Sequence, residues 1–152
     1  MKLDIALLSN KLIPYYLGEI DDILAGTSSK LKEKGIIVKW HEKNYFIEHG
    51  FFITSHDKKI KVFFGIWFSF WEYSGNPLCI CLELGDEMAK NRFSKCLASF
   101  GDIFGEIKNY EGYMVAPFSR KYSENMNDIK LVKLVEEFCG KMNLNIYFSK
   151  DI

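Results

Sequence analysis

The sequence lacks net charge and lacks any long apolar run, and both absences limit its partners. Its 20 basic and 20 acidic side chains balance, so no overall field draws the chain to nucleic acid or to an anionic membrane. No segment approaches the ~18 consecutive apolar residues of a membrane span, and the start, MKLDIALLSN, is too short and too acidic for a secretory signal. We therefore expect a cytoplasmic protein without a membrane anchor, and the charge balance argues against nucleic acid as a partner.

Histidine and cysteine are also scarce, with three and four copies. Cys79 and Cys81 stand two positions apart, whereas zinc ligands usually come as two pairs, each spaced two to four residues apart on a turn. No histidine lies in a nucleophile motif, and no glycine-rich phosphate-binding loop is present. The sequence predicts no metal, no cofactor and no catalytic residue, and it indicates free, reduced thiols.

What the chain does contain is an unusual share of aromatic residues, 16%, within a composition that is 48% hydrophobic and 26% charged. This composition is typical of a folded globular protein and not of a disordered one. A chain of 152 residues is long enough to bury one compact core. We expect a single domain that spans residues 1–152.

The period of the apolar residues changes along the chain, and each change marks an expected helix or strand. A period near 3.6 predicts helices at Pro14–Lys34, between Asp86 and Gly101, and at Asp128–Met142. A period of two, with turn residues between, predicts strands at Ile36–His41, Tyr45–Thr54, Ile60–Phe70, Leu78–Leu84, Ile103–Lys108, Tyr113–Ala116 and Leu144–Phe148. Gly50 indicates a bulge in the second strand, Gly26 a break in the first helix, and Ser119–Asn127 a long loop.

The order of these elements, α-ββββ-α-ββ-α-β, indicates an α+β fold. Consecutive strands joined by short turns pair antiparallel, and helices outside such a meander pack together on the sheet. We therefore expect one antiparallel meander sheet with helices mainly on one face.

Seven aromatic residues lie between Phe63 and Tyr73, in the stretch KVFFGIWFSFWEYSGNPLCIC. In an extended chain, the even positions from Ile60 to Phe70 form one wholly apolar face, which must be core. The opposite face carries Phe63, Trp67 and Trp71. These rings are either core, with the first helix covering one face of the strand and the last helix the other, or part of a binding surface.

The binding interpretation depends on Gly65 and Ser69, which leave room beside the ring of Trp67. It predicts a solvent-accessible Trp67 or Trp71 and an aromatic surface or pocket with a polar rim. The candidate binding residues are Phe63, Trp67, Trp71, Glu72 and Tyr73. The segment does not match the basic, glycine and aromatic pattern of strands that stack RNA bases.

This interpretation describes a small cytoplasmic binding or regulatory module. The expected partner is another protein or a second copy of the chain, since an open aromatic face of this size is typical of protein interfaces. A small-molecule ligand is a further alternative.

A different class of function is a metal-dependent hydrolase or nuclease with a carboxylate site. Its candidate residues are Glu72, Glu83 and Asp86. Such an enzyme needs these carboxylates to hold a divalent ion in one cleft. The predicted central strand carries no acid, and Asp86 also fits the start of a helix, where negative charge is favourable.

Overall fold

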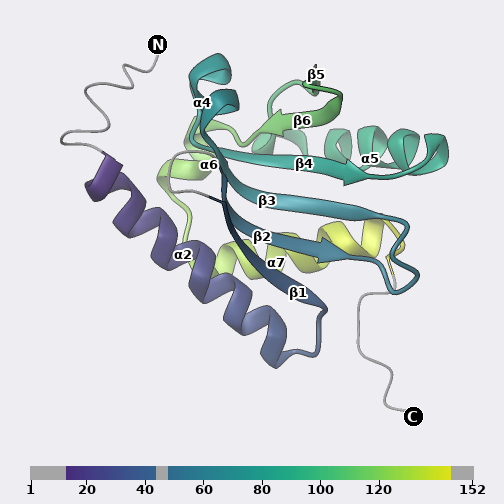
Figure 1. The fold of residues 1–152 in the computed structure, drawn as a ribbon, viewed down its shortest axis with the longest axis horizontal. Coiled ribbons are helices and arrows are strands. Elements are labelled where there is room, and N and C mark those ends of the chain that lie inside the picture. Colours follow the sequence, from purple (N-terminus) through teal and green to yellow (C-terminus); the bar gives the residue numbers. More distant parts are fainter. Residues whose placement is uncertain (1–12, 44–47, 145–152) are drawn as a thin grey trace.

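The chain folds as an α+β structure built on one antiparallel sheet, which confirms the predicted fold class. The computed structural model describes residues 13–43 and 48–144 (Figure 1). The strands are β1 (Val38–Lys43), β2 (Glu48–Thr54), β3 (Lys61–Trp67), β4 (Leu78–Leu84), β5 (Lys108–Tyr110) and β6 (Tyr113–Pro117). The helices are α2 (Ile13–Glu33), α4 (Phe68–Ser74), α5 (Glu87–Ser99), α6 (Arg120–Glu124) and α7 (Asp128–Lys141), with a 3₁₀ turn η2 (Gly101–Ile103).

The sheet has the strand order β1-β2-β3-β4-β6-β5, and every neighbouring pair is antiparallel. The first four strands form the predicted meander. The turn between β2 and β3 closes where the Ser55 N–H donates to the Ile60 carbonyl at 2.9 Å. Strands β3 and β4 therefore lie in the middle of the sheet, and β1 and β5 lie at its edges.

Helices α2, α5 and α7 contribute to one hydrophobic core on the same face of the sheet, and Figure 1 shows α5 and α7 behind the strands. Leu24 of α2, Phe93 of α5 and Phe138 of α7 are fully buried there. The ring of Phe64, at the centre of β3, lies 5.5 Å from Phe51 and 5.4 Å from Phe138. Among the described residues, no helix has both the length and the apolar character needed to cross a membrane.

Polar side chains fix where two of these helices begin, as the sequence predicts. Asp86 accepts a hydrogen bond from the backbone N–H three residues further on at 2.9 Å, and Asn127 accepts the equivalent bond at 2.8 Å. Each bond satisfies an N–H that the first turn of a helix leaves unpaired. An ion pair of 2.7 Å between Lys30 and Asp128 also joins α2 to the start of α7.

The predicted strand Ile60–Phe70 is wrong at its carboxyl end, because the chain turns into helix α4 at Phe68. In a helix, residues three apart share a face. Phe68 and Trp71 accordingly lie together in the main core, with ring centroids 5.5 Å apart, while Phe70 lies in a second cluster. The helix ends at Gly75, whose φ of 80° is a left-handed conformation that favours glycine.

Several other local predictions need correction. The register of β2 with both of its neighbours is regular across Gly50, and the irregularity lies at Lys61/Val62 in β3. Helix α2 continues through Gly26 without a break. The structure places η2 and the shorter β5 where Ile103–Lys108 is predicted as a strand, and α6 within the predicted loop. The predicted strand Leu144–Phe148 and the start of Tyr45–Thr54 fall largely outside the described residues.

Candidate functional site

The face of the sheet opposite the main core carries a second, smaller hydrophobic cluster. Its buried members come from β2, β3, α4, β4 and β6: Phe52, Phe63, Trp67, Phe70, Cys79, Cys81 and Val115. These residues alternate along their strands with the residues that face α2, α5 and α7. We call this face the outer face of the sheet.

Side chains with a polar end cover much of the outer face. The ring of Tyr110 lies 5.0 Å from Trp67 and 5.3 Å from Phe70. At the other end of the cluster, the Lys61 ammonium lies 4.0 Å above the ring of Phe52. The alternative in which Phe63, Trp67 and Trp71 are core is confirmed by their burial. Its expected cover by the last helix is wrong for this face, because the buried residues of α7 belong to the main core.

The structure separates the five predicted binding residues. Phe63 and Trp67 lie on the outer face but are only 3% and 8% exposed, and Trp71 lies in the main core at 4%. The prediction of an accessible Trp67 or Trp71 is therefore wrong. Glu72 and Tyr73 are exposed on α4.

The room that the sequence suggested beside Trp67 is also filled. A Cβ atom added to Gly65 would lie 2.7 Å from Gly50 Cα and 2.8 Å from the ring of Phe63. Ser69 lies on the exposed side of α4. Gly65 therefore allows β2 and β3 to approach closely and leaves no slot.

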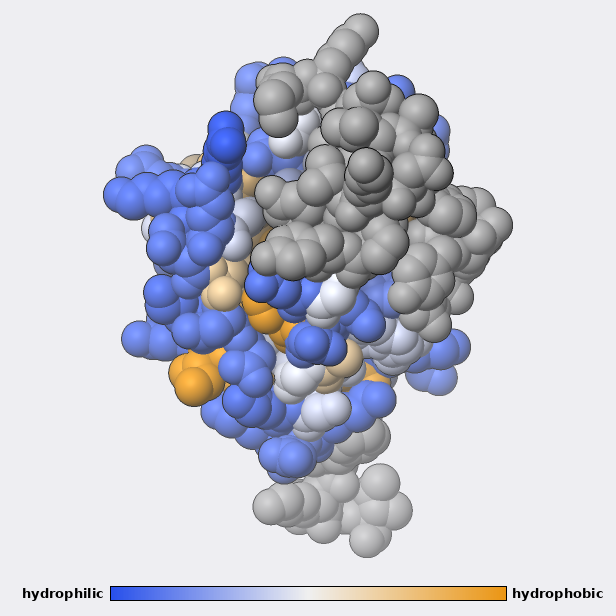
Figure 2. Space-filling view, turned by 90° about the vertical axis from the view of Figure 1, so that its left-hand side faces the viewer, coloured by the Kyte–Doolittle hydropathy of each residue, from blue (hydrophilic) through white to orange (hydrophobic). Residues whose placement is uncertain are grey.

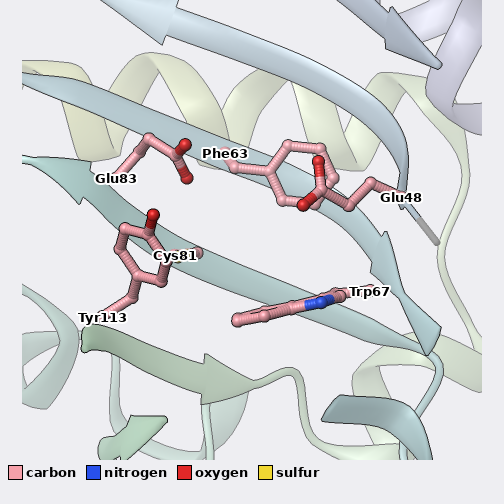
Figure 3. A pocket seen from close by; sticks show the side chains of 6 residues that line it. All are labelled: Glu48, Phe63, Trp67, Cys81, Glu83 and Tyr113. Carbon is pink, nitrogen blue, oxygen red and sulfur yellow. The ribbon is translucent and has the colours of Figure 1, made fainter. Parts of the chain in front are cut away.

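A small pocket remains on the outer face where the cover is incomplete. Its volume is about 30 Å³, two to three times the ~10–15 Å³ that a cavity needs to hold one water molecule. Figure 3 shows the lining side chains arranged around a shared space above β3 and β4. These residues are Glu48, Phe63, Trp67, Cys81, Glu83 and Tyr113.

The two carboxylates of the pocket differ in their partners. Glu48, at the start of β2, accepts a hydrogen bond of 2.6 Å from Nε2 of His41 on β1. The half-buried Glu83, near the end of β4, makes no hydrogen bond or ion pair within the described part of the chain. The pocket therefore holds one carboxylate with a cationic or hydrogen-bonding partner and one without.

The thiol of Cys81 lies at the floor of the pocket and is 2% exposed. Burial raises the pKa of this thiol far above its ordinary value, and the nearby Cys79, Glu83 and Glu48 raise it further. The group is therefore a protonated, neutral S–H. It makes no hydrogen bond to any residue that the structure describes.

The carboxylates of the alternative acidic site lie on different elements. Glu72 is on α4, Glu83 is on β4, and Asp86 caps α5 at the opposite end of β4 from α4 (Figure 1). Within residues 13–43 and 48–144, no group of three or more histidine, cysteine, aspartate or glutamate side chains could hold a metal ion.

A larger hollow of about 390 Å³ lies beside α6, lined in part by Ser119, Tyr122, Asn125 and Lys130. Some of its polar side chains have partners within the described residues. The Lys130 ammonium donates to the Asn125 carbonyl at 3.0 Å, and Ser119 caps α6. Asp102 and Lys121 complete its polar lining.

Comparison with protein-family models, with curated proteins and with solved structures gave no match for this chain. The function must therefore be argued from the geometry of the chain itself.

The sequence missed three lining residues of the pocket: Glu48, Cys81 and Tyr113. The alternation in Leu78–Leu84 does place Cys81 and Glu83 on one face of a strand. Their neighbours across the sheet follow only from the pairing register, in which Cys81 faces Phe63 on one side and Val115 on the other.

Proposed function

We propose that this chain is a small binding module, and that the pocket on the outer face receives a side chain of a partner protein. The observation that carries the proposal is the combination, in one cavity, of aromatic walls, a buried thiol and a carboxylate, Glu83, that has no partner among the described residues. Glu83 is half-buried and pairs with no group among the described residues, so its carboxylate is available to a group of a partner.

Exposed tyrosines beside the pocket support a protein partner. Tyr73 and Tyr113 are 61% and 36% exposed, and Tyr73 stacks on Tyr110 with ring centroids 5.4 Å apart. Tyrosine is enriched among residues that dominate protein interfaces, because it buries a large ring while its hydroxyl tolerates water. These three tyrosines form an aromatic rim that a partner can cover.

Figure 2 shows another side of the molecule. Its coloured atoms are mainly hydrophilic, and the hydrophobic areas among them are small and separate. We place the proposed role in the cytoplasm, where the four free cysteines would stay reduced.

A peptide selection tests this proposal. A displayed peptide library is selected on the immobilised full chain, and the dissociation constants of the enriched peptides are measured for wild type, Tyr113→Ala and Ile129→Ala. Ile129 is 69% exposed on α7 and serves as the control for loss of an exposed apolar side chain.

We expect Tyr113→Ala to weaken binding about thirtyfold, the effect of a ~2 kcal/mol interface residue, and Ile129→Ala to change little. Enriched peptides that bind wild type and Tyr113→Ala equally would contradict the proposal. If the wild-type chain forms a dimer and Tyr113→Ala abolishes that dimer, the partner is a second copy of the chain and not another protein.

A further inference from the structure

The charges around the pocket determine the kind of group it can accept. Two carboxylates, Glu48 and Glu83, line the same small cavity. The nearby lysines are engaged elsewhere, since Lys61 lies over the ring of Phe52 at 4.0 Å and Lys108 pairs with Glu106 at 3.0 Å. An anion would be repelled here, and a neutral group would leave Glu83 without a compensating charge. The pocket therefore favours a cation.

The aromatic walls favour the same choice. Phe63, Trp67 and Tyr113 border the cavity, and the faces of such rings attract a cation within about 6 Å of the ring centre. The floor is the neutral thiol of Cys81, which is buried, makes no hydrogen bond within the described residues and carries no positive charge. No lining residue opposes a positive group.

The size of the pocket selects among cations. Its volume of about 30 Å³ is only two to three times the ~10–15 Å³ that a cavity needs to hold one water molecule. A primary ammonium is a compact charge with three hydrogen-bond donors, whereas a guanidinium is a wide planar fork. A trimethylated ammonium is also much larger than water. A cavity this small suits the compact primary ammonium best.

From these observations we infer that the pocket binds the primary ammonium of a lysine side chain. The inference rests on the proposed function, because the lysine belongs to the partner protein. Its ammonium donates to Glu83 and to the free lone pairs of Glu48, while its aliphatic stem lies along the exposed ring of Tyr113. Glu83 thereby gains the partner that it lacks within the described chain.

A titration with small probes tests the ligand class. Propylammonium chloride is added to the full-length protein at constant ionic strength, and the indole N–H resonance of Trp67 is followed by NMR. Propan-1-ol provides a neutral molecule of similar shape, and tetramethylammonium chloride provides a larger cation. We expect a saturable shift with propylammonium and no saturable shift with either of the other two.

Paired variants test the role of Glu83. Glu83→Gln and Glu87→Gln each remove one carboxylate, but Glu87 is 87% exposed on α5 and does not line the pocket. We expect Glu83→Gln to weaken propylammonium binding about tenfold or more, the effect of losing a charge-assisted hydrogen bond. Glu87→Gln should bind as wild type does. An unchanged amide spectrum confirms that each variant is folded.

Three results would overturn the inference: no saturable shift with propylammonium, tighter binding of tetramethylammonium, or equal effects of the two variants. Selected peptides separate this failure from failure of the proposed function. If they depend on Tyr113 but tolerate replacement of every lysine by methionine, the lysine assignment fails and the binding module stands. If binding of no selected peptide depends on Tyr113, the proposed function as a binding module fails, whatever the result of the propylammonium titration.

Discussion

The close approach of β2 and β3 at Gly50 and Gly65 predicts that Gly65→Ala destabilises the protein. The two glycines face each other across the strands, and a Cβ at Gly65 would also contact the His49 carbonyl. That Cβ would lie 2.7 Å from Gly50 Cα, whereas ordinary contact begins at 3.4 Å. Because the neighbour is backbone, β2 and β3 would have to separate by at least roughly 0.7 Å, the difference between these two distances.

The size of the effect follows from two opposing contributions. Overpacking costs up to ~3 kcal/mol, and the upper end applies here because backbone cannot rotate away. Replacing glycine restricts the unfolded chain and returns ~0.4–1 kcal/mol. The net loss is about 2 kcal/mol, which lowers the melting temperature of a protein of this size by roughly 4–8 °C.

A matched control makes this prediction sharper. Gly140 lies within α7, and a Cβ there would meet nothing within 4 Å. Gly140→Ala should therefore stabilise the protein by up to ~1 kcal/mol through helix propensity, and raise the melting temperature by about 2–4 °C. Thermal unfolding by circular dichroism and urea unfolding measure both variants. A Gly65→Ala protein that melts at or above the wild-type temperature would refute the argument from strand spacing.

Three further predictions concern titratable and aromatic groups. The four free cysteines are buried, and burial raises their pKa values, so a thiol reagent should label none of them in the native protein and all four in denaturant; rapid native labelling would contradict this. The hydrogen bond from the Lys30 ammonium holds the pKa of Asp128 below its ordinary value of 3.8. A lowered folded pKa gives stability that is present above the unfolded pKa and is lost as the pH falls through the folded pKa. Asp128→Asn should therefore destabilise the protein near neutral pH and less in acid, as measured by urea unfolding; a difference that does not shrink in acid would exclude this pair as the cause. In a Trp40→Phe variant, the remaining Trp67 and Trp71, 8% and 4% exposed, should show blue-shifted emission and weak acrylamide quenching; strong quenching would mean that at least one of the two rings is accessible to solvent.

The sequence predicted most elements correctly because their signals are local. Leu78–Leu84 and the start of α7 at Asp128 are confirmed to the residue, since alternation and a capping side chain depend only on near neighbours. The predicted strand Ile60–Phe70 is wrong from Phe68 onwards, because local patterns are ambiguous there. In a run that is almost wholly apolar, the period of two and the period of 3.6 both place large side chains in the core, so the switch to α4 has no local signal.

The candidate site was only partly predictable. Phe63, Trp67 and Glu83 were named from the sequence, but in two separate candidate sites, and Trp71 was assigned to the wrong face. The assignment of Trp71 failed because the chain after β3 forms the seven-residue helix α4 and does not continue as an extended strand. The pocket joins side chains of four strands. The alternation within one strand does not predict which residues of the next strand lie beside it.

The sequence alone determined that this chain forms an antiparallel sheet with amphipathic helices, because periodicity and turn chemistry act over a few residues. Only the tertiary structure decided that Phe63 and Trp67 are almost fully covered, and that Glu48, Glu83 and Tyr113 meet above them. Those outcomes depend on strand register and on how side chains close over the outer face. Both are set by contacts between residues far apart in the chain, which local sequence does not encode.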